Sequence, residues 1–425
     1  MKIETKCLHE GYKPANGGPG VMPIVQSTTY RFDSTAHIAG LFDMPTEFMY
    51  SRFANPTCDA VEKKIASLEG GAGAMLTSSG QAANLLAILN LCSAGDSFIA
   101  ASTIYGGTIN LFGVTLKKFG IECIWADAEA SEEEIQKLFK DNTKAVFGET
   151  LANPALTVFD IEKWANIAHK NGVPLIVDNT FATPINCRPF ECGADIVTHS
   201  TTKYMDGHGA ALGGAIVDSG KFDWMAHADK FPGLTTPDDS YHGIVYAERF
   251  GKEGAFITKA TAQLMRDFGA MQSPQNAYYL NLGLESLALR MERHCANAQK
   301  MAEFLQGHKA VSWVTYCGLP GDNCYELGRK YLPKGSCGVL SFGVKGGRNA
   351  AEEFMKKLRT IAIETHVADA RSCCLHPASA THRQMNDREL EEAGVKPELI
   401  RLSVGIENID DLIADVKQAL DGLPQ

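Results

Sequence analysis

The sequence has no long apolar run and no block of basic residues, and each absence excludes a class of protein. The longest mainly apolar stretch, residues 82–92, is about half of the ~20 residues that a membrane-spanning helix needs. The 425 residues include 40 Lys and Arg against 50 Asp and Glu, so the formal net charge is −10. We therefore expect neither a membrane protein nor a nucleic-acid binder, because anionic lipid and nucleic acid both attract basic surfaces.

The chain also lacks the usual metal and disulfide patterns. Its 12 cysteines form no C-x-x-C pair, and only Cys373 and Cys374 are adjacent. The first residues are charged where an export signal would be apolar, so we expect reduced thiols and a cytoplasmic location. The histidines form no H-E-x-x-H motif, and we expect no metal site. A redox role for Cys373 and Cys374 is possible in principle, but buried packing is the more common role of cysteine.

Three regions differ in pattern. Residues 1–60 are interrupted by Gly and Pro, which predicts an extended arm with short helices. In residues 61–265, helix-like stretches alternate with short apolar runs, and this alternation predicts an α/β domain with a mainly parallel sheet. Residues 266–425 predict a smaller α+β domain, which begins with a long helix whose apolar side chains share one face over 284–305. The expected strands of the first domain are 97–100, 121–125, 145–149, 174–178, 195–198 and 214–217.

Polar side chains follow two expected strands at the point where each strand ends. Asp178 ends one strand, and Ser200, Thr202 and Lys203 follow the next. Ligands of open α/β sheets bind beyond these ends, so the four side chains are expected to converge. A lysine can form a Schiff base with pyridoxal 5′-phosphate (PLP), hydroxyls can hold its phosphate, and an aspartate can keep its pyridine nitrogen protonated. From residue types alone, a surface lysine near a capping aspartate is an equally good interpretation.

A small and polar segment, residues 77–81, precedes an apolar helix. The free N–H groups of a helix N-terminus bind phosphate well, although a plain serine N-cap is the more common use of such residues. The segment is not a Walker loop, because no Gly-Lys-Ser/Thr follows it. Gly71 and Gly73 lack the third glycine of a dinucleotide fingerprint, which weakens the alternative of a nicotinamide dehydrogenase.

Seven short motifs together match one family in order and cover nearly the whole chain. They lie at 79–83, 105–108, 153–154, 177–180, 200–204, 376–379 and 401–407. With them, the chain resembles the Cys/Met-metabolism PLP-dependent enzymes, the cystathionine γ-synthase-like group of fold type I. The resemblance implies a PLP cofactor, a mainly parallel large-domain sheet and a smaller C-terminal α+β domain.

The resemblance also implies roles for individual residues. Lys203 would bind PLP covalently and move protons, and Asp178 would pair with the pyridine nitrogen. Tyr105 would stack on the ring, and Asn153 would contact the ring hydroxyl and the substrate. Arg401 would bind the substrate carboxylate, a role that favours a bidentate guanidinium. The phosphate ligands would be Gly80, Gln81, Ser200 and Thr202.

Tyr50 and Arg52 match a pair that reaches the phosphate in a neighbouring subunit. The active site is therefore expected only in a dimer or larger assembly, and the resemblance suggests four chains. Tyr50 would then act in catalysis beside Lys203 and Tyr105.

Within the family, residues 231–248, 289–294 and 381–385, together with Gln81, resemble the O-acetylhomoserine sulfhydrylase branch. This branch predicts γ-replacement, in which sulfide or methanethiol displaces acetate from O-acetyl-L-homoserine to give homocysteine or methionine. Three alternatives stay open: a methionine γ-lyase-like elimination, a cystathionine γ-synthase, and a catalytically silent relative. Gly107 stands where methionine γ-lyases place a cysteine, which counts against the lyase.

Residues 366–371 depart from the family pattern close to the expected substrate. The choice of thiol acceptor, and any part that His366 has in it, is therefore left open by the resemblance.

Overall fold

The computed structural model describes residues 1–43, 47–380 and 396–423. Within these residues, seven strands form one sheet in the order β1-β7-β6-β5-β4-β2-β3. Their bounds are β1 (Gly73–Thr77), β2 (Ser97–Ala101), β3 (Glu122–Ala126), β4 (Thr143–Glu149), β5 (Leu175–Asp178), β6 (Ile196–His199) and β7 (Gly214–Asp218). Strands β2 to β6 pair in parallel, whereas β7 is antiparallel to both β6 and β1. The expected mainly parallel sheet is confirmed.

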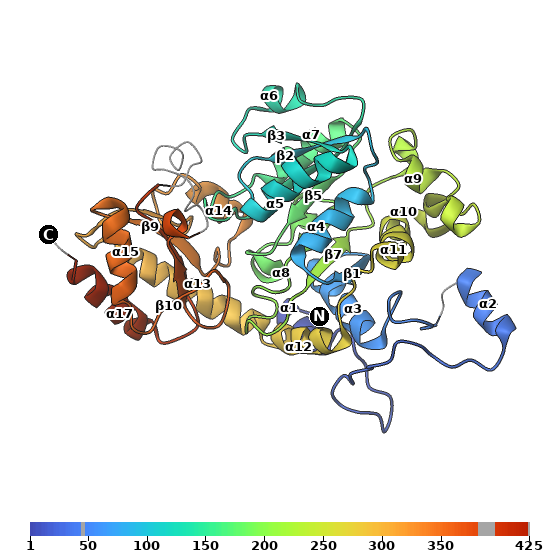
Figure 1. Cartoon of the computed structure of the whole chain (residues 1–425), viewed down its shortest axis with the longest axis horizontal. Helices are drawn as coiled ribbons and strands as arrows, with labels where there is room; N and C mark the ends of the chain where they lie inside the picture. Colours follow the sequence, from blue (N-terminus) through green and yellow to red (C-terminus); the bar gives the residue numbers. More distant parts are fainter. Residues whose placement is uncertain (44–46, 381–395, 424–425) are drawn as a thin grey trace.

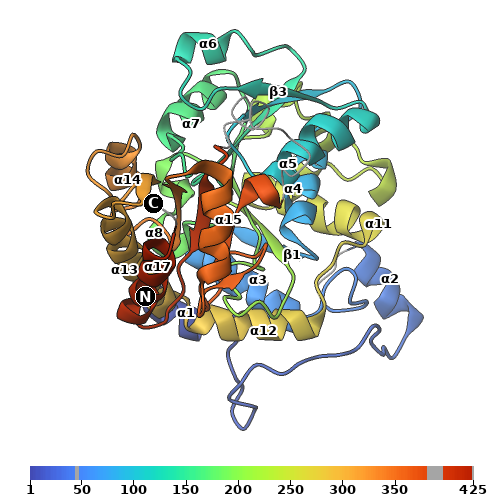
Figure 2. The same cartoon turned by 60° about the vertical axis from the view of Figure 1, so that its left-hand side comes forward.

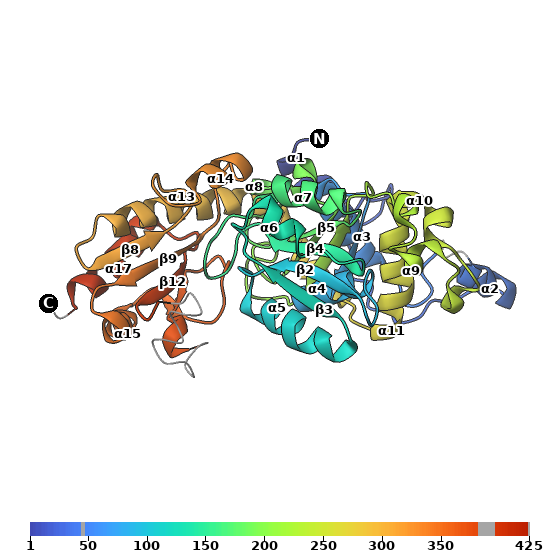
Figure 3. The same ribbon diagram turned by 90° about the horizontal axis from the view of Figure 1, so that it is seen from above.

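The strands of this sheet could be identified in the sequence because most of them are buried. Strands β2, β4, β6 and β7 are buried along their whole length, and a strand covered on both faces reads as a short continuous apolar run. Helix α7 (Ile161–Lys170) lies on one side of the sheet, and α4 (Gly80–Leu89) and α5 (Gly106–Asn110) lie on the other (Figure 3). The sequence did not predict β1, because glycines at 70, 71 and 73 resemble a turn.

Five further strands form a second sheet in the described residues, in the order β10-β11-β12-β9-β8 (Figure 1). Their bounds are β8 (Val311–Thr315), β9 (Val339–Val344), β10 (Ala362–Ile363), β11 (Cys373–Leu375) and β12 (Leu399–Ser403). Helices α15 (Gly347–Lys357) and α17 (Ile409–Asp421) pack side by side against it (Figure 2). This region has a hydrophobic core of its own.

Helix α13 (Leu287–Gln306) connects the two regions. It contacts α8 (Thr183–Asn186) beside the large sheet, and β8 and β9 of the small sheet. The expected long helix is therefore present, but it begins at Leu287 and is preceded by a separate helix, α12 (Pro274–Glu285). The expected domain boundary at residue 266 falls at the start of α11 (Arg266–Phe268) and stays a prediction.

The N-terminal segment extends away from the large sheet as an arm (Figure 1). It carries α1 (Ile3–His9) against the body and α2 (Thr35–Asp43) at its far end, before α3 (Pro56–Glu69) returns to the sheet. No helix of the described residues is long and apolar enough to span a membrane. The other α-helices in the described part of the chain are α6 (Glu132–Gln136), α9 (Pro232–Thr235), α10 (Tyr246–Lys259) and α14 (Tyr325–Tyr331).

Candidate active site

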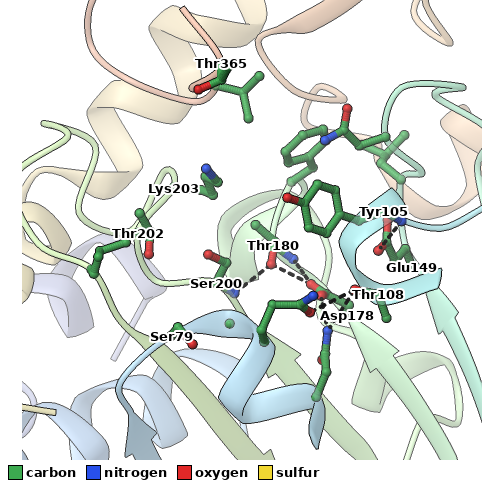
Figure 4. Close-up of a pocket in the computed structure, with 18 of the residues that line it drawn as sticks. Ser79, Tyr105, Thr108, Glu149, Asp178, Thr180, Ser200, Thr202, Lys203 and Thr365 are labelled. Carbon is green, nitrogen blue, oxygen red and sulfur yellow. Dashed lines mark hydrogen bonds between the residues drawn. The ribbon is translucent and has the colours of Figure 1, made fainter. Parts of the chain in front are cut away.

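A cavity of about 210 Å³ opens at the carboxyl ends of β4, β5 and β6, where the two sheet regions meet (Figure 4). The large-sheet region supplies most of its walls, and the small-sheet region supplies Thr365, Val367 and Arg401. Nine of the eleven predicted site residues line this cavity. They are Gly80, Gln81, Tyr105, Asn153, Asp178, Ser200, Thr202, Lys203 and Arg401.

Asp178 lies at the base of the cavity, where neutral donors hold its carboxylate. The backbone N–H of Thr180 donates to Oδ1 over 3.0 Å, and the Thr180 hydroxyl donates to the same atom. The side-chain amide of Asn84 donates to Oδ2 over 3.3 Å. Among the described residues, no cation pairs with this carboxylate. A half-buried carboxylate without a counter-ion is suited to a positively charged N–H group of a ligand.

Lys203 follows β6 and extends toward the centre of the cavity (Figure 4). Burial lowers the pKa of its amine, and the nearby charge of Arg401 lowers it further. Its Nζ lies 3.3 Å from Nδ1 of His366, and it forms no ion pair with the described residues. A lysine with a lowered pKa is more often the free amine, which is the nucleophilic form.

The N-terminus of α4 forms another part of the cavity wall. Ser79 caps the helix by accepting the N–H of Ala82 over 3.1 Å, which leaves the N–H groups of Gly80 and Gln81 without an intrahelical acceptor. A Cβ at Gly80 would lie 2.6 Å from the Cβ of Ser200, so the close approach of these two segments requires glycine. Backbone N–H groups at such a position bind phosphate well.

Thr202 also lines the cavity. Its hydroxyl lies 3.1 Å from both the N–H and the carbonyl oxygen of Gly213, so it both donates to and accepts from this glycine. The hydroxyl is therefore held in place at the cavity wall.

Arg401 approaches from β12 of the small sheet. Its guanidinium donates to the side chain of Asn153 and to the carbonyl of Thr365, each over 3.2 Å. Its Nε is buried and has no hydrogen-bond partner among the described residues. An unpaired N–H on a buried guanidinium costs free energy. Because a carboxylate could accept a hydrogen bond from it, the side chain is suited to bind one.

Glu149 is a cavity residue that the sequence reasoning did not assign. It ends β4 directly beside Asp178, and its Oε1 accepts the backbone N–H of Tyr105 over 2.8 Å. Burial, and secondarily the charge of Asp178, raise the pKa of this carboxyl well above its usual range. Its position at the end of an expected strand is the same signal that identified Asp178.

Tyr50 and Arg52 are the two predicted residues that the structure does not bring to the cavity. They lie on the N-terminal arm, where Arg52 donates to the carbonyl of Arg266 and its guanidinium lies 5.3 Å from the Tyr50 ring centre. Within one chain, the site therefore lacks both. Residues 381–385, which contributed to the branch resemblance, lie outside the described residues.

The sequence profile of the Cys/Met metabolism PLP-dependent enzymes matches residues 4–421. The chain belongs to this family. It is 44% identical over 434 residues to the O-acetyl-L-homoserine sulfhydrylase of Leptospira meyeri, an alignment that covers 100% of this chain and 97% of the relative. It is also 44% identical over 436 residues to the homocysteine/cysteine synthase of Saccharomyces cerevisiae, covering 99% and 97% of the two chains.

A solved structure supports the same assignment. A Campylobacter jejuni protein described as an O-acetylhomoserine (thiol)-lyase superposes with a TM-score of 0.94 at 38% identity, and the match covers 99% of this chain and 100% of that one. That crystal structure contains a pyridoxyl-lysine monophosphate. The predicted fold class is confirmed.

The cavity fits the cofactor of this PLP-dependent family. Within the part of the chain that the structure describes, Asp178 has no cation partner and Lys203 has no ion pair, and Gly80 leaves room beside the free N–H groups of α4. These features suit the pyridine nitrogen, the aldehyde carbon and the phosphate of PLP respectively. When bound, PLP withdraws electrons from the α-carbon of an amino acid.

Proposed function

We propose that this protein replaces the acetate of O-acetyl-L-homoserine with sulfide or methanethiol, giving homocysteine or methionine. The observation that carries the proposal is the convergence of Lys203, Asp178 and Arg401 on one cavity in a chain related over its full length to O-acetyl-L-homoserine sulfhydrylase. The chain is also 44% identical over 427 residues to the O-acetyl-L-homoserine sulfhydrylase 1 of Thermus thermophilus.

The site residues divide into three groups by function. Asp178, Gly80, Gln81, Ser200, Thr202, Tyr105 and Asn153 would hold the cofactor. Arg401 and Asn153 orient the substrate carboxylate, and Lys203 removes protons from the substrate carbons. Fixing substrate and base in one geometry is a large part of what such a protein contributes to rate.

The lowered pKa of Lys203 suits its part as a base. A buried lysine beside the positive charge of Arg401 releases its own proton more readily than a lysine in water, so at neutral pH more of it is present as the free amine.

Gly107 favours γ-replacement over the lyase alternative. A Cβ at this position would lie 2.5 Å from the ring of Tyr105 and 3.0 Å from the side-chain amide of Gln81. A cysteine at this position, which the lyase resemblance requires, would therefore need the Tyr105 ring to shift.

We infer that the active sites are shared between subunits of a homotetramer built from dimers, in the cytoplasm. Tyr50 and Arg52 belong to the N-terminal segment and do not line the cavity of their own chain, which supports this assembly. Mixing Lys203→Ala chains with Tyr50→Phe chains tests it. One intact site forms in each mixed dimer if the sites are shared, so activity should return to about a quarter of the wild-type rate. No recovery would contradict shared sites.

The substrate assignment is tested by measuring steady-state rates with matched substrates. O-acetyl-L-homoserine should react at least tenfold faster than O-succinyl-L-homoserine, with sulfide or methanethiol as the acceptor. A preference for the succinyl ester with L-cysteine as acceptor, giving cystathionine, would instead establish the cystathionine γ-synthase alternative.

A further inference from the structure

Asn84 connects four elements of the large-sheet region at the base of the cavity. It lies on α4, lines the cavity and is 2% exposed. Its amide Nδ2 lies 3.3 Å from Oδ2 of Asp178, at the end of β5, and 3.4 Å from the hydroxyl of Thr108 on α5. Its Oδ1 lies 2.6 Å from the hydroxyl of Thr198 on β6. Both ends of this buried amide therefore have partners, and one of them is the carboxylate assigned to the cofactor.

The charge of Asp178 determines how the Asn84 amide is oriented. An ionised carboxylate only accepts hydrogen bonds, so the NH2 group of Asn84 faces Oδ2 and its carbonyl oxygen faces Thr198. The Thr198 hydroxyl is then the donor of that contact. Thr108 accepts from the amide, and its own proton goes to Oε1 of Gln81, 3.2 Å away. Each hydrogen bond of this network therefore has a single direction.

The hydrogen bonds on Asp178 leave one acceptor position open. An ionised carboxylate has about four lone-pair positions, shared equally between its two oxygens. Oδ1 accepts from both the N–H and the hydroxyl of Thr180, which fills its positions. Oδ2 accepts only from Asn84 among the described residues. The open position is therefore on Oδ2, the oxygen that Asn84 contacts.

The two sides of the carboxylate are held by different segments. On the Oδ1 side, the Thr180 hydroxyl accepts the N–H of Ser200 over 2.8 Å, so this contact belongs to the segment after β6 (Figure 4). On the Oδ2 side, Asn84 is held by Thr198, which is fully buried and pairs with Asp178 in the register of β5 and β6. Without the amide, only the Oδ1 side would be held.

We propose that Asn84 is a positioning residue that keeps Oδ2 of Asp178 directed at the ring nitrogen of PLP. The torsion about the Cβ–Cγ bond of aspartate is broad, and the N–H bond from Asn84 restricts it. A charged partner that already has its working orientation loses less conformational freedom when the ligand binds. The inference rests on the proposed role of Asp178 and deepens it.

The proposal limits the effect of Asn84 to one part of the cofactor. The phosphate and the aldehyde of PLP are assigned to the N-terminus of α4 and to Lys203, whereas Asn84 contacts neither. Loss of its amide should therefore weaken the contact of Asp178 with the ring nitrogen. A general disturbance of α4 would instead weaken binding of the phosphate as well, and would affect any ligand that carries one.

The variant Asn84→Leu tests the inference, because leucine has nearly the shape of asparagine but no donor. Apoprotein of the wild type and of the variant is titrated with PLP and with deaza-PLP, an analogue in which a C–H group replaces the ring nitrogen. Both compounds carry the same aldehyde and phosphate, so the comparison isolates the contact with Asp178. The measured quantity is the dissociation constant of each compound, followed by quenching of tryptophan fluorescence.

The matched control is Asn90→Leu, at the C-terminal end of the same helix. The buried amide of Asn90 donates to the carbonyl of Phe256 over 2.9 Å, and Asn90 does not line the cavity. This variant loses a buried donor of the same kind without touching Asp178.

We expect the wild type to bind PLP roughly tenfold or more tightly than deaza-PLP, because only PLP can form a charge-assisted hydrogen bond with Asp178. In Asn84→Leu, the dissociation constant should rise roughly fivefold or more for PLP and by less than about twofold for deaza-PLP. Asn90→Leu should keep the wild-type preference between the two compounds.

An equal rise for both compounds in Asn84→Leu would show that the amide only supports the fold of α4, and would overturn the inference. An unchanged dissociation constant for PLP would overturn it as well. If the leucine variant does not fold, Asn84→Ala also removes the donor, and its two dissociation constants decide between the same outcomes.

The test separates this inference from the proposed function, because binding constants do not depend on which substrate is turned over. A wild type that binds both compounds equally well would overturn the role of Asp178 and this inference with it, while the product formed from O-acetyl-L-homoserine would still decide the proposed function. If no homocysteine is formed, the proposed function fails, and the binding constants still decide the part of Asn84.

Discussion

Protonation of His294 should destabilise the fold, and this histidine joins the two parts of the active site. It lies on α13 and is fully buried. Its Nδ1 donates to the carbonyl of Val404, just after β12, over 2.8 Å. Its ring packs edge-on against Tyr204, the residue after Lys203, with the ring centres 4.9 Å apart. Its Nε2 has no partner among the described residues, so an added proton would have no acceptor.

The size of the loss in unfolding free energy follows from the pKa shift of His294. Burial lowers the pKa of His294 to about 4, compared with about 6.5 in an unfolded chain. As the pH falls, the unfolded state takes up a proton first, so the free energy of unfolding decreases below pH 6.5 and levels off below the folded pKa. Linkage gives a loss of about 2 kcal/mol between about pH 7.5 and about pH 5 from this one residue.

Urea unfolding of wild type and His294→Gln at these two pH values measures the effect, at fixed protein concentration and with saturating PLP. Glutamine can still donate to Val404 but does not titrate. The pH-dependent loss of unfolding free energy should therefore be about 2 kcal/mol smaller in the variant than in the wild type. His9→Gln, at an exposed position on α1, should leave the loss unchanged. An equal loss in wild type and His294→Gln would refute the reasoning.

Substitutions at three further residues test the cavity. Lys203→Ala should abolish turnover. It should also abolish the covalent bond to PLP, which is detected by mass spectrometry after borohydride reduction. Normal turnover in this variant would show that Lys203 is not the catalytic base. Arg401→Ala should raise KM for the amino-acid substrate at least tenfold, and Arg401→Lys should recover only part of this loss, since a lysine cannot form the bidentate contact. An unchanged KM in Arg401→Ala would exclude carboxylate binding there. Glu149→Gln should keep kcat/KM within about threefold, because the raised pKa makes Glu149 a neutral acid that glutamine resembles. A hundredfold loss would show that its charge is required.

Much of the large sheet could be predicted because most of its strands are buried along nearly their whole length. All six expected strands of this region are present within one or two residues of their expected bounds. The convergence of Asp178 and Lys203 could also be predicted, because adjacent parallel strands end at the same edge of a sheet. Only the local order of residues and one topological rule were needed.

The rest of the site depends on contacts between distant segments. Arg401 meets Asn153 from the other sheet, 248 residues away in the chain, and only the family resemblance identified it beforehand. Glu149 was not assigned, because its role depends on the N–H of Tyr105 and on the neighbouring Asp178. His366 was noticed as a departure from the family pattern, but its contact with Lys203 required the packing of the small sheet against the large one.

The most direct test of the account is product analysis of purified protein given O-acetyl-L-homoserine, with and without sulfide, beside a control with methionine alone. The account predicts homocysteine and acetate in equal amounts when sulfide is present, and little product in the methionine control. Formation of 2-oxobutanoate from methionine, with little homocysteine from the ester, would contradict it and show that the protein is a lyase.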